Sequence, residues 1–127
     1  MKTLASLLLI SAIAFAQGPA RYRLDTAAGT SAIGDGGAAI SAILSYPNAV
    51  LADDKGGFYV ADEQHYRIRY VAANGVIRTV VGAGVAGLTP DGVAGLENSV
   101  TTISAMALSA NGDLYFVDQT SCILLPR

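Results

Sequence analysis

The side chains best suited to chemistry cluster around the single histidine of the chain, His65. Tyr66, Arg67 and Arg69 follow it closely. A zinc site built on imidazole needs two or three histidines, and a serine nucleophile of the hydrolase type needs a Gly-x-Ser-x-Gly context that this sequence lacks. We therefore predict no catalytic residue, no metal site and no cofactor. His65, Tyr66, Arg67 and Arg69 are expected at the rim of a sheet, where they form a candidate binding surface.

The two arginines are two residues apart, so they share one face of an extended strand. Two partners are possible for them. They could form ion pairs with Asp62 or Glu63, or they could contact a ligand. The ion pairs are the favoured interpretation, and the ligand contact stays open.

Four aspartates are predicted to be structural. Asp35 and Asp91 each precede a glycine, and a calcium loop would need several carboxylates where each of these segments offers one. Asp62 and Asp118 each end an apolar run, where a carboxylate can accept N–H groups of the turn that follows. Recurrence at matching places favours turn and cap roles over catalysis.

The lone cysteine, Cys122, has no internal disulfide partner. No His, Lys or Arg lies within three residues to activate it. We expect a buried, inert thiol, with a reactive or intermolecular thiol as the alternative.

The first sixteen residues have the three parts of a secretory signal peptide. Lys2 precedes an apolar run over residues 4–14, and Ala14-Phe15-Ala16 forms a small-x-small site. The run is shorter than the about 20 residues that a membrane span needs. We predict a signal helix over residues 1–16, cleavage after Ala16, and a secreted or periplasmic protein without a membrane span.

Charge argues against nucleic acid as a partner. The chain has 8 basic and 10 acidic residues, and removing Lys2 with the signal peptide leaves a net charge of −3. Binding to nucleic acid depends on clustered cations.

A gap-free internal repeat organises the remaining chain. Residues 48–62 match residues 104–118 at an offset of 56, and repeats of this kind indicate stacked structural units. Short runs rich in aromatic and branched residues, bounded by Gly and Asp, predict strands at about 48–53, 58–62, 67–72 and 76–81. Asn74-Gly75 predicts a two-residue hairpin turn, and residues 38–44 predict one or two helical turns capped by Asp35 or by Gly36-Gly37.

Four-stranded sheets that are apolar on both faces are typical of propeller blades. We therefore predict an all-β fold, a partial β-propeller of about one and a half to two antiparallel blades. The blade units are expected at about 34–89 and 90–127, the second of them incomplete.

Several motifs at these positions resemble the NHL-repeat β-propellers of bacteria. The motifs are Gly34-Asp35-Gly36-Gly37, Tyr46-Pro47, Gly57-Phe58-Tyr59-Val60-Ala61-Asp62 and Arg67-Ile68-Arg69. The second unit departs from the family pattern. In a gap-free alignment Ser121-Cys122 replaces His65-Tyr66, Ile123-Leu124-Leu125 replaces Arg67-Ile68-Arg69, Pro126 interrupts the third strand and the fourth strand is missing.

The resemblance implies a non-enzymatic binding or scaffold module with a protein or carbohydrate ligand. The alternative is the N-terminal part of a gluconolactonase-like or lyase-like propeller enzyme whose active site needs further blades. Family propellers close with more blades than two, so we expect a truncated product, with self-association through exposed blade faces as the other possibility.

Overall fold

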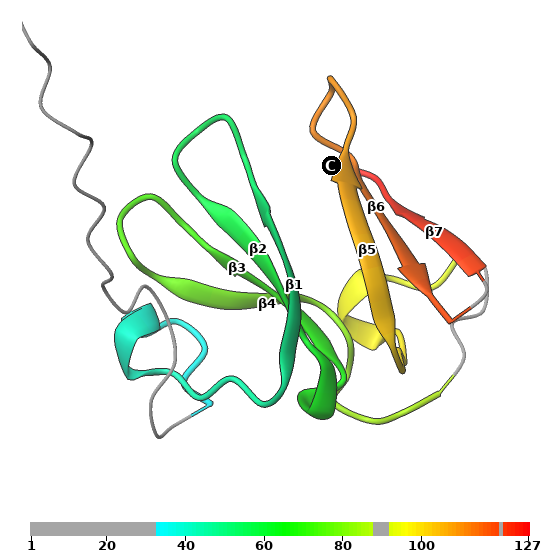
Figure 1. Ribbon diagram of the computed structural model, residues 1–127, viewed down its shortest axis with the longest axis horizontal. Coiled ribbons are helices and arrows are strands. Elements are labelled where there is room, and N and C mark those ends of the chain that lie inside the picture. The colour runs from blue at the N-terminus through cyan, green and yellow to red at the C-terminus, as the bar shows by residue number, and fades with distance from the viewer. Residues whose placement is uncertain (1–32, 88–91, 120) are drawn as a thin grey trace, which may run out of the picture.

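The computed structural model describes residues 33–87, 92–119 and 121–127, which form two antiparallel β-sheets (Figure 1). The strands are β1 (Pro47–Ala52), β2 (Phe58–Asp62), β3 (Arg67–Val71), β4 (Ile77–Val81), β5 (Ile103–Leu108), β6 (Leu114–Asp118) and β7 (Ser121–Leu125). The sheet orders are β1-β2-β3-β4 and β5-β6-β7. The helical elements of these residues are the 3-10 turns η1 (Ala39–Ser41), η2 (Glu63–His65) and η3 (Gly95–Glu97). The predicted all-β partial propeller is confirmed. The predicted signal helix, the cleavage site and Asp91 lie outside the described residues.

The repeat in the sequence is also a repeat in the structure. The strands β5 and β6 begin 56 residues after β1 and β2, and η3 begins 56 residues after η1. Both inner hairpins also close in the same way, since Asp53 donates its N–H to Gly57 at 2.9 Å and Ser109 donates to Asp113 at 3.0 Å. Each unit therefore forms the same first hairpin at corresponding positions.

The third strand of the second unit departs from this spacing. Asp62 pairs with Arg67 across four turn residues, whereas Asp118 pairs with Ser121 across only two. The turn between β6 and β7 is therefore two residues shorter than the turn between β2 and β3.

The shorter turn corrects the gap-free alignment. Ile123 pairs with Phe116 as Arg69 pairs with Val60, so Ile123 takes the place of Arg69. The expectations that Ser121-Cys122 replaces His65-Tyr66 and that Pro126 interrupts the strand are wrong, because Pro126 follows the last residue of β7. The expectation that this sheet lacks a fourth strand is confirmed for the described residues.

The hairpin between β3 and β4 has a longer loop than predicted. Gly75 donates its N–H to the carbonyl of Ala72 at 2.8 Å, and Ala72 donates to Val76 at 2.9 Å. Gly75 has a φ of 80°, while Asn74 does not adopt a positive φ. The prediction of a two-residue turn is therefore wrong. A three-residue loop forms in which only the last position needs the left-handed conformation that glycine accepts.

The predicted helical turn exists as η1, but its cap is different. Ala38 occupies the N-cap position without a side-chain cap and forms an isolated bridge with Val76. Asp35 instead accepts a hydrogen bond from Arg69. The capping role expected for Asp35 is wrong, because its carboxylate is taken by a buried cation.

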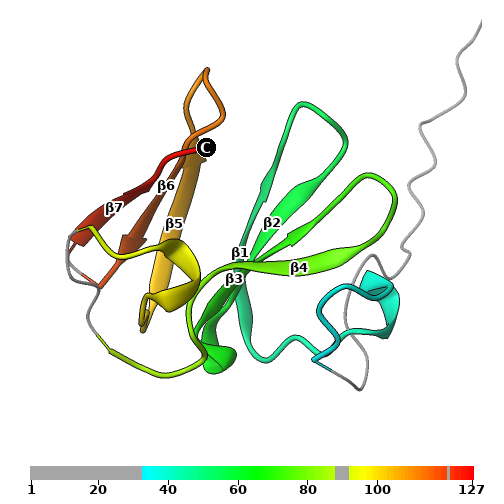
Figure 2. The ribbon, with the colours of Figure 1, turned by 180° about the vertical axis from the view of Figure 1, so that it is seen from behind.

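Apolar clusters bury both faces of the first sheet. One face packs against the second sheet, with β1 beside β5 and η3 against β4 (Figure 2). This core cluster consists of Ala61, Ile68, Val81, Val100, Ile103, Leu114 and Phe116. The opposite face packs against the segment before β1, in a cluster of Ala39, Ala42, Val71 and Ile77. None of the described strands packs against the outer face of the second sheet, where Leu124 is 47% exposed.

Candidate functional site

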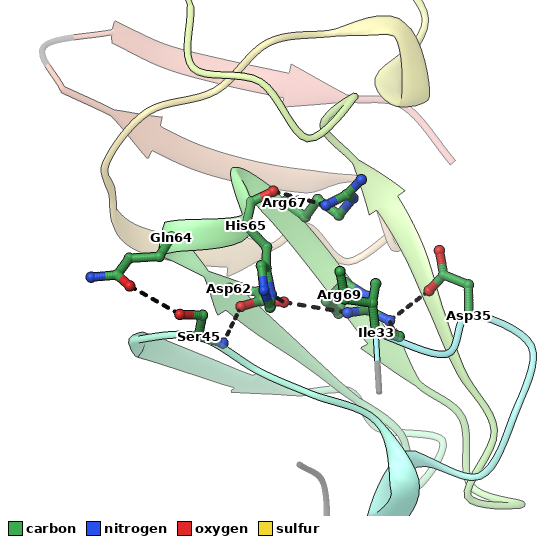
Figure 3. Close-up of polar contacts among 8 residues, drawn as sticks. All are labelled: Ile33, Asp35, Ser45, Asp62, Gln64, His65, Arg67 and Arg69. Carbon is green, nitrogen blue, oxygen red and sulfur yellow. Dashed lines mark hydrogen bonds and ion pairs between the residues drawn. The ribbon is translucent and has the colours of Figure 1, made fainter. Parts of the chain in front are cut away.

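Arg69 is the centre of a polar cluster on the face of the first sheet that packs against the preceding segment (Figure 3). Its side chain is fully buried. One terminal nitrogen donates to Asp35 Oδ1 and to the carbonyl of Ile33, both at 2.7 Å, and the other donates to Asp62 Oδ2 at 3.3 Å. A buried guanidinium is tolerated only when acceptors surround it. Arg69 therefore ties the segment at residues 33–35 to the middle of the sheet.

Asp62 is equally buried and joins three parts of the chain. Its Oδ1 accepts the N–H of Ser45 at 2.7 Å, and its Oδ2 lies 2.8 Å from Nδ1 of His65. The predicted bonds to N–H groups of the following turn are wrong. The segment before β1 runs beside the end of β2, where Pro47 pairs with Asp62. The backbone N–H of Ser45 in this segment donates to the carboxylate instead.

Asp118 repeats this anchor without the arginine. Its Oδ1 accepts the N–H of Thr101 at 3.1 Å, the N–H of Thr102 at 3.0 Å and the hydroxyl of Thr101 at 2.6 Å. Thr101 lies 56 residues after Ser45. The aspartate that ends each second strand is thus a structural anchor for the chain before each first strand.

The four residues predicted for binding lie in three different places. His65 and Arg67 lie at the turn end of the first sheet, where Arg67 donates to the carbonyl of His65 at 3.0 Å and the His65 side chain is 20% exposed. Tyr66 has a φ of 53° and packs against the core between the sheets. Arg69 is buried, so its expected place at an exposed rim is wrong. Its predicted pairing with Asp62 is confirmed.

Sequence reasoning missed the side chains around His65, of which Tyr46, Asn48 and Gln64 are exposed and Glu63 is half-buried. We name these residues and His65 the turn surface. Tyr46 is 70% exposed. Asn48 donates to Glu63 at 2.8 Å, and Ser45 donates its hydroxyl to Gln64 at 3.0 Å. The signal was available, because pairing the ends of two predicted strands brings the residues before the first beside the residues after the second.

At the opposite end of the sheet, Tyr70 donates its hydroxyl to Asp53 at 2.7 Å. This hydrogen bond is the main cause that lowers the pKa of Asp53 below its usual 3.8 and raises the pKa of Tyr70 above 10.0. Asp53 also accepts the N–H groups of Lys55 and Gly57. The pair therefore closes the β1–β2 hairpin.

Cys122 lies on β7 and is exposed, so its expected burial is wrong. The strand is at the edge of the second sheet, and its outer face has no further sheet against it in the described residues. In those same residues, no three His, Cys, Asp or Glu side chains are close enough to hold a metal ion. No helix there is both long and apolar enough to cross a membrane.

Comparison with known families agrees with this architecture. Residues 26–90, about half of the chain, match the family described as the teneurin NHL domain. The match includes the whole first sheet and the residues that form its polar cluster. No curated protein matches the chain. The chain belongs to the teneurin NHL domain family, and its two sheets are part of an NHL-type β-propeller.

Proposed function

We propose that the chain is an exported, non-enzymatic binding module that holds a carbohydrate or protein ligand at the turn surface. The observation that carries the proposal is the combination of one exposed ring with fixed polar groups around it. Tyr46 supplies an amphipathic ring at low entropic cost. The amide and carboxylate of Asn48 and Glu63 are already paired, so they are ordered before a ligand arrives.

The polar cluster behind this surface supports binding over catalysis. His65 and Asp62 resemble a catalytic base and the carboxylate that orients it. However, Asp62 also accepts hydrogen bonds from Ser45 and Arg69 as a structural acceptor. A catalytic pair needs a reacting group within hydrogen-bond reach. The contacts of Asp62 with Ser45 and Arg69 support a structural role for its carboxylate.

The binding test compares two side chains of equal exposure. Tyr46 and Val50 are each 70% exposed, and both lie at or beside β1. Glycan arrays and a panel of purified extracellular proteins would be probed with the wild type, Tyr46→Ala and Val50→Ala. We expect at least one ligand that Tyr46→Ala loses and Val50→Ala keeps. Equal binding by both variants would refute the turn surface, and chemical conversion of the ligand would refute a purely binding role.

Export has a separate test. Expression of the complete sequence in a bacterial host, followed by fractionation and mass measurement, should give a periplasmic or secreted product beginning at Gln17. A cytoplasmic product that retains residues 1–16 would refute export.

A further inference from the structure

The outer edge of the second sheet borders an open groove. Among the described strands, β7 pairs with β6 on one side and with none on the other. A groove of about 700 Å³ runs along its other side, between residues 121–126 and residues 92–95. An edge strand presents unpaired N–H and C=O groups that accept a further strand.

The first sheet shows what such a groove holds. There β4 pairs with β3 on one side, as in the pair Arg69 and Thr79. On the other side Ile77 donates to Gly37 at 3.1 Å and accepts from Gly36 at 2.8 Å. Residues 92–93 are the repeat of Gly36 and Gly37 at the offset of 56. The groove therefore has both walls of a strand site, and a fourth strand is what the first sheet places between them.

A buried acceptor in the groove points to the same occupant. Asn98 is 5% exposed and lines the groove, and its Oδ1 accepts no hydrogen bond from the residues that the structure describes. A buried acceptor without a donor destabilises the fold. In the first unit the corresponding residue is Ala42, which packs with Ile77 of β4. An added strand would bring backbone N–H groups to this side of the groove.

The sequence contains one more segment of the β4 type. Residues 24–29 (Leu-Asp-Thr-Ala-Ala-Gly) match residues 77–82 (Ile-Arg-Thr-Val-Val-Gly), with identical Thr and Gly and with apolar residues at the same three places. Each segment precedes an Asp-Gly pair, Asp35-Gly36 or Asp91-Gly92. We propose that residues 24–28 of a second copy of this chain enter the groove beside β7 as the fourth strand of the second sheet.

Connectivity favours a second copy over the same chain. The strand β4 leads into residues 92–103, which pack between the two sheets. Residues 24–28 lead in the same way into residues 33–44, which cover the opposite face of the first sheet. The sheet they complete must therefore lie on that opposite face. The second sheet of another copy meets this condition, because the copies then repeat the relation between the two sheets of one chain.

Such head-to-tail contacts close into a ring when the rotation allows it. Each copy supplies two blades, and propellers usually have four to eight, so the ring holds about two to four copies. The contact would also cover the open face of the second sheet, where Tyr115 is 38% and Leu124 is 47% exposed.

Cysteine cross-linking tests the register. Val81 pairs with Ile68 in the first sheet, and their counterparts in the complex are Ala28 and Cys122. Opposite residues of antiparallel strands lie close enough for a disulfide after small adjustments. Under mild oxidation, Ala28→Cys should give covalent dimers and larger closed species about tenfold faster than Ala27→Cys, because only position 28 holds its thiol at high effective concentration. Ala27 corresponds to Val80, which the β3–β4 register skips at its bulge.

Three outcomes would overturn the proposal. Equal rates for Ala28→Cys and Ala27→Cys would show random thiol contact, and a cross-linked monomer would show insertion within one chain. Ala28→Cys combined with Cys122→Ser should lose the specific product.

Light scattering on the wild type gives a second readout that needs no variant. We expect two to four copies that dissociate with excess of a peptide spanning residues 21–30, and a peptide-insensitive monomer would refute strand donation whether or not the turn surface binds a ligand.

Discussion

Replacing Asp62 with asparagine should destabilise the chain far more than the same change at Asp118. Both carboxylates end the second strand of a sheet, both are buried, and both accept backbone N–H groups from the segment before the first strand. Only Asp62 also faces a buried cation, Arg69, at 3.3 Å. The pair of variants therefore separates the ion pair from the shared anchor.

The expected magnitudes follow from the partners that remain. Asp62→Asn keeps an oxygen for the N–H of Ser45 but leaves Arg69 with Asp35, whose side chain is 46% exposed. Removing one partner of a buried pair costs about 3–5 kcal/mol. We expect about 3 kcal/mol, because Asp35 retains part of the attraction. Asp118→Asn only weakens hydrogen bonds from a charged to a neutral acceptor, for about 1 kcal/mol.

Urea unfolding followed by circular dichroism and tyrosine fluorescence measures both, since the chain has no tryptophan. With a slope of about 1.5 kcal/mol per M, the midpoint of Asp62→Asn should fall about 2 M below the wild type. Adding Arg69→Met to Asp62→Asn should restore part of the loss, because the uncompensated buried charge disappears. Equal losses of stability in Asp62→Asn and Asp118→Asn would refute the reasoning. A double variant whose loss of stability exceeds the summed losses of Asp62→Asn and Arg69→Met would refute it as well.

Two further predictions concern the hydrogen bond between Tyr70 and Asp53 and the apolar core between the sheets. Tyr70→Phe removes the hydrogen bond that lowers the pKa of Asp53. A carboxyl group whose pKa is lower in the folded than in the unfolded state stabilises the fold at pH values above its unfolded-state pKa. This stabilisation is lost as the pH falls through the folded-state pKa. The gap in unfolding free energy between the wild type and Tyr70→Phe should therefore shrink below pH 3.8 in urea titrations. Phe116→Ala, at a site 1% exposed between the sheets, should cost about 3–5 kcal/mol in the same assay. Tyr115→Ala, on the open face, should cost under about 1 kcal/mol, and equal losses would contradict the core assignment.

The strands were predictable because each has its own local signal. The apolar runs of β2 and β6 are bounded by glycine and aspartate, and the offset of 56 links the two units without reference to coordinates. Turn lengths were harder. The turn after β6 is two residues shorter than the turn after β2. A gap-free alignment does not reveal this difference, because Ile123 is compatible with a strand in either register.

The burial of Arg69 could not be predicted from its neighbours. An arginine that alternates with apolar residues along a strand normally faces solvent. Here its acceptors come from Asp35, 34 positions earlier, and from Asp62, seven positions earlier. Only the folded chain brings them together. Cys122 was misjudged for a related reason, since exposure depends on whether another sheet packs beside β7.

The two sheets also differ at the end that we propose for binding, and the difference follows from the shared anchor. Asp62 and Asp118 hold the residue two places before β1 and β5, so they fix where the next side chain lies. In the first unit that side chain is Tyr46, and in the second it is Thr102. Both are exposed, but only the tyrosine offers a ring. The anchor therefore presents whichever residue stands at this position, and a ligand that needs the ring should contact the first sheet alone.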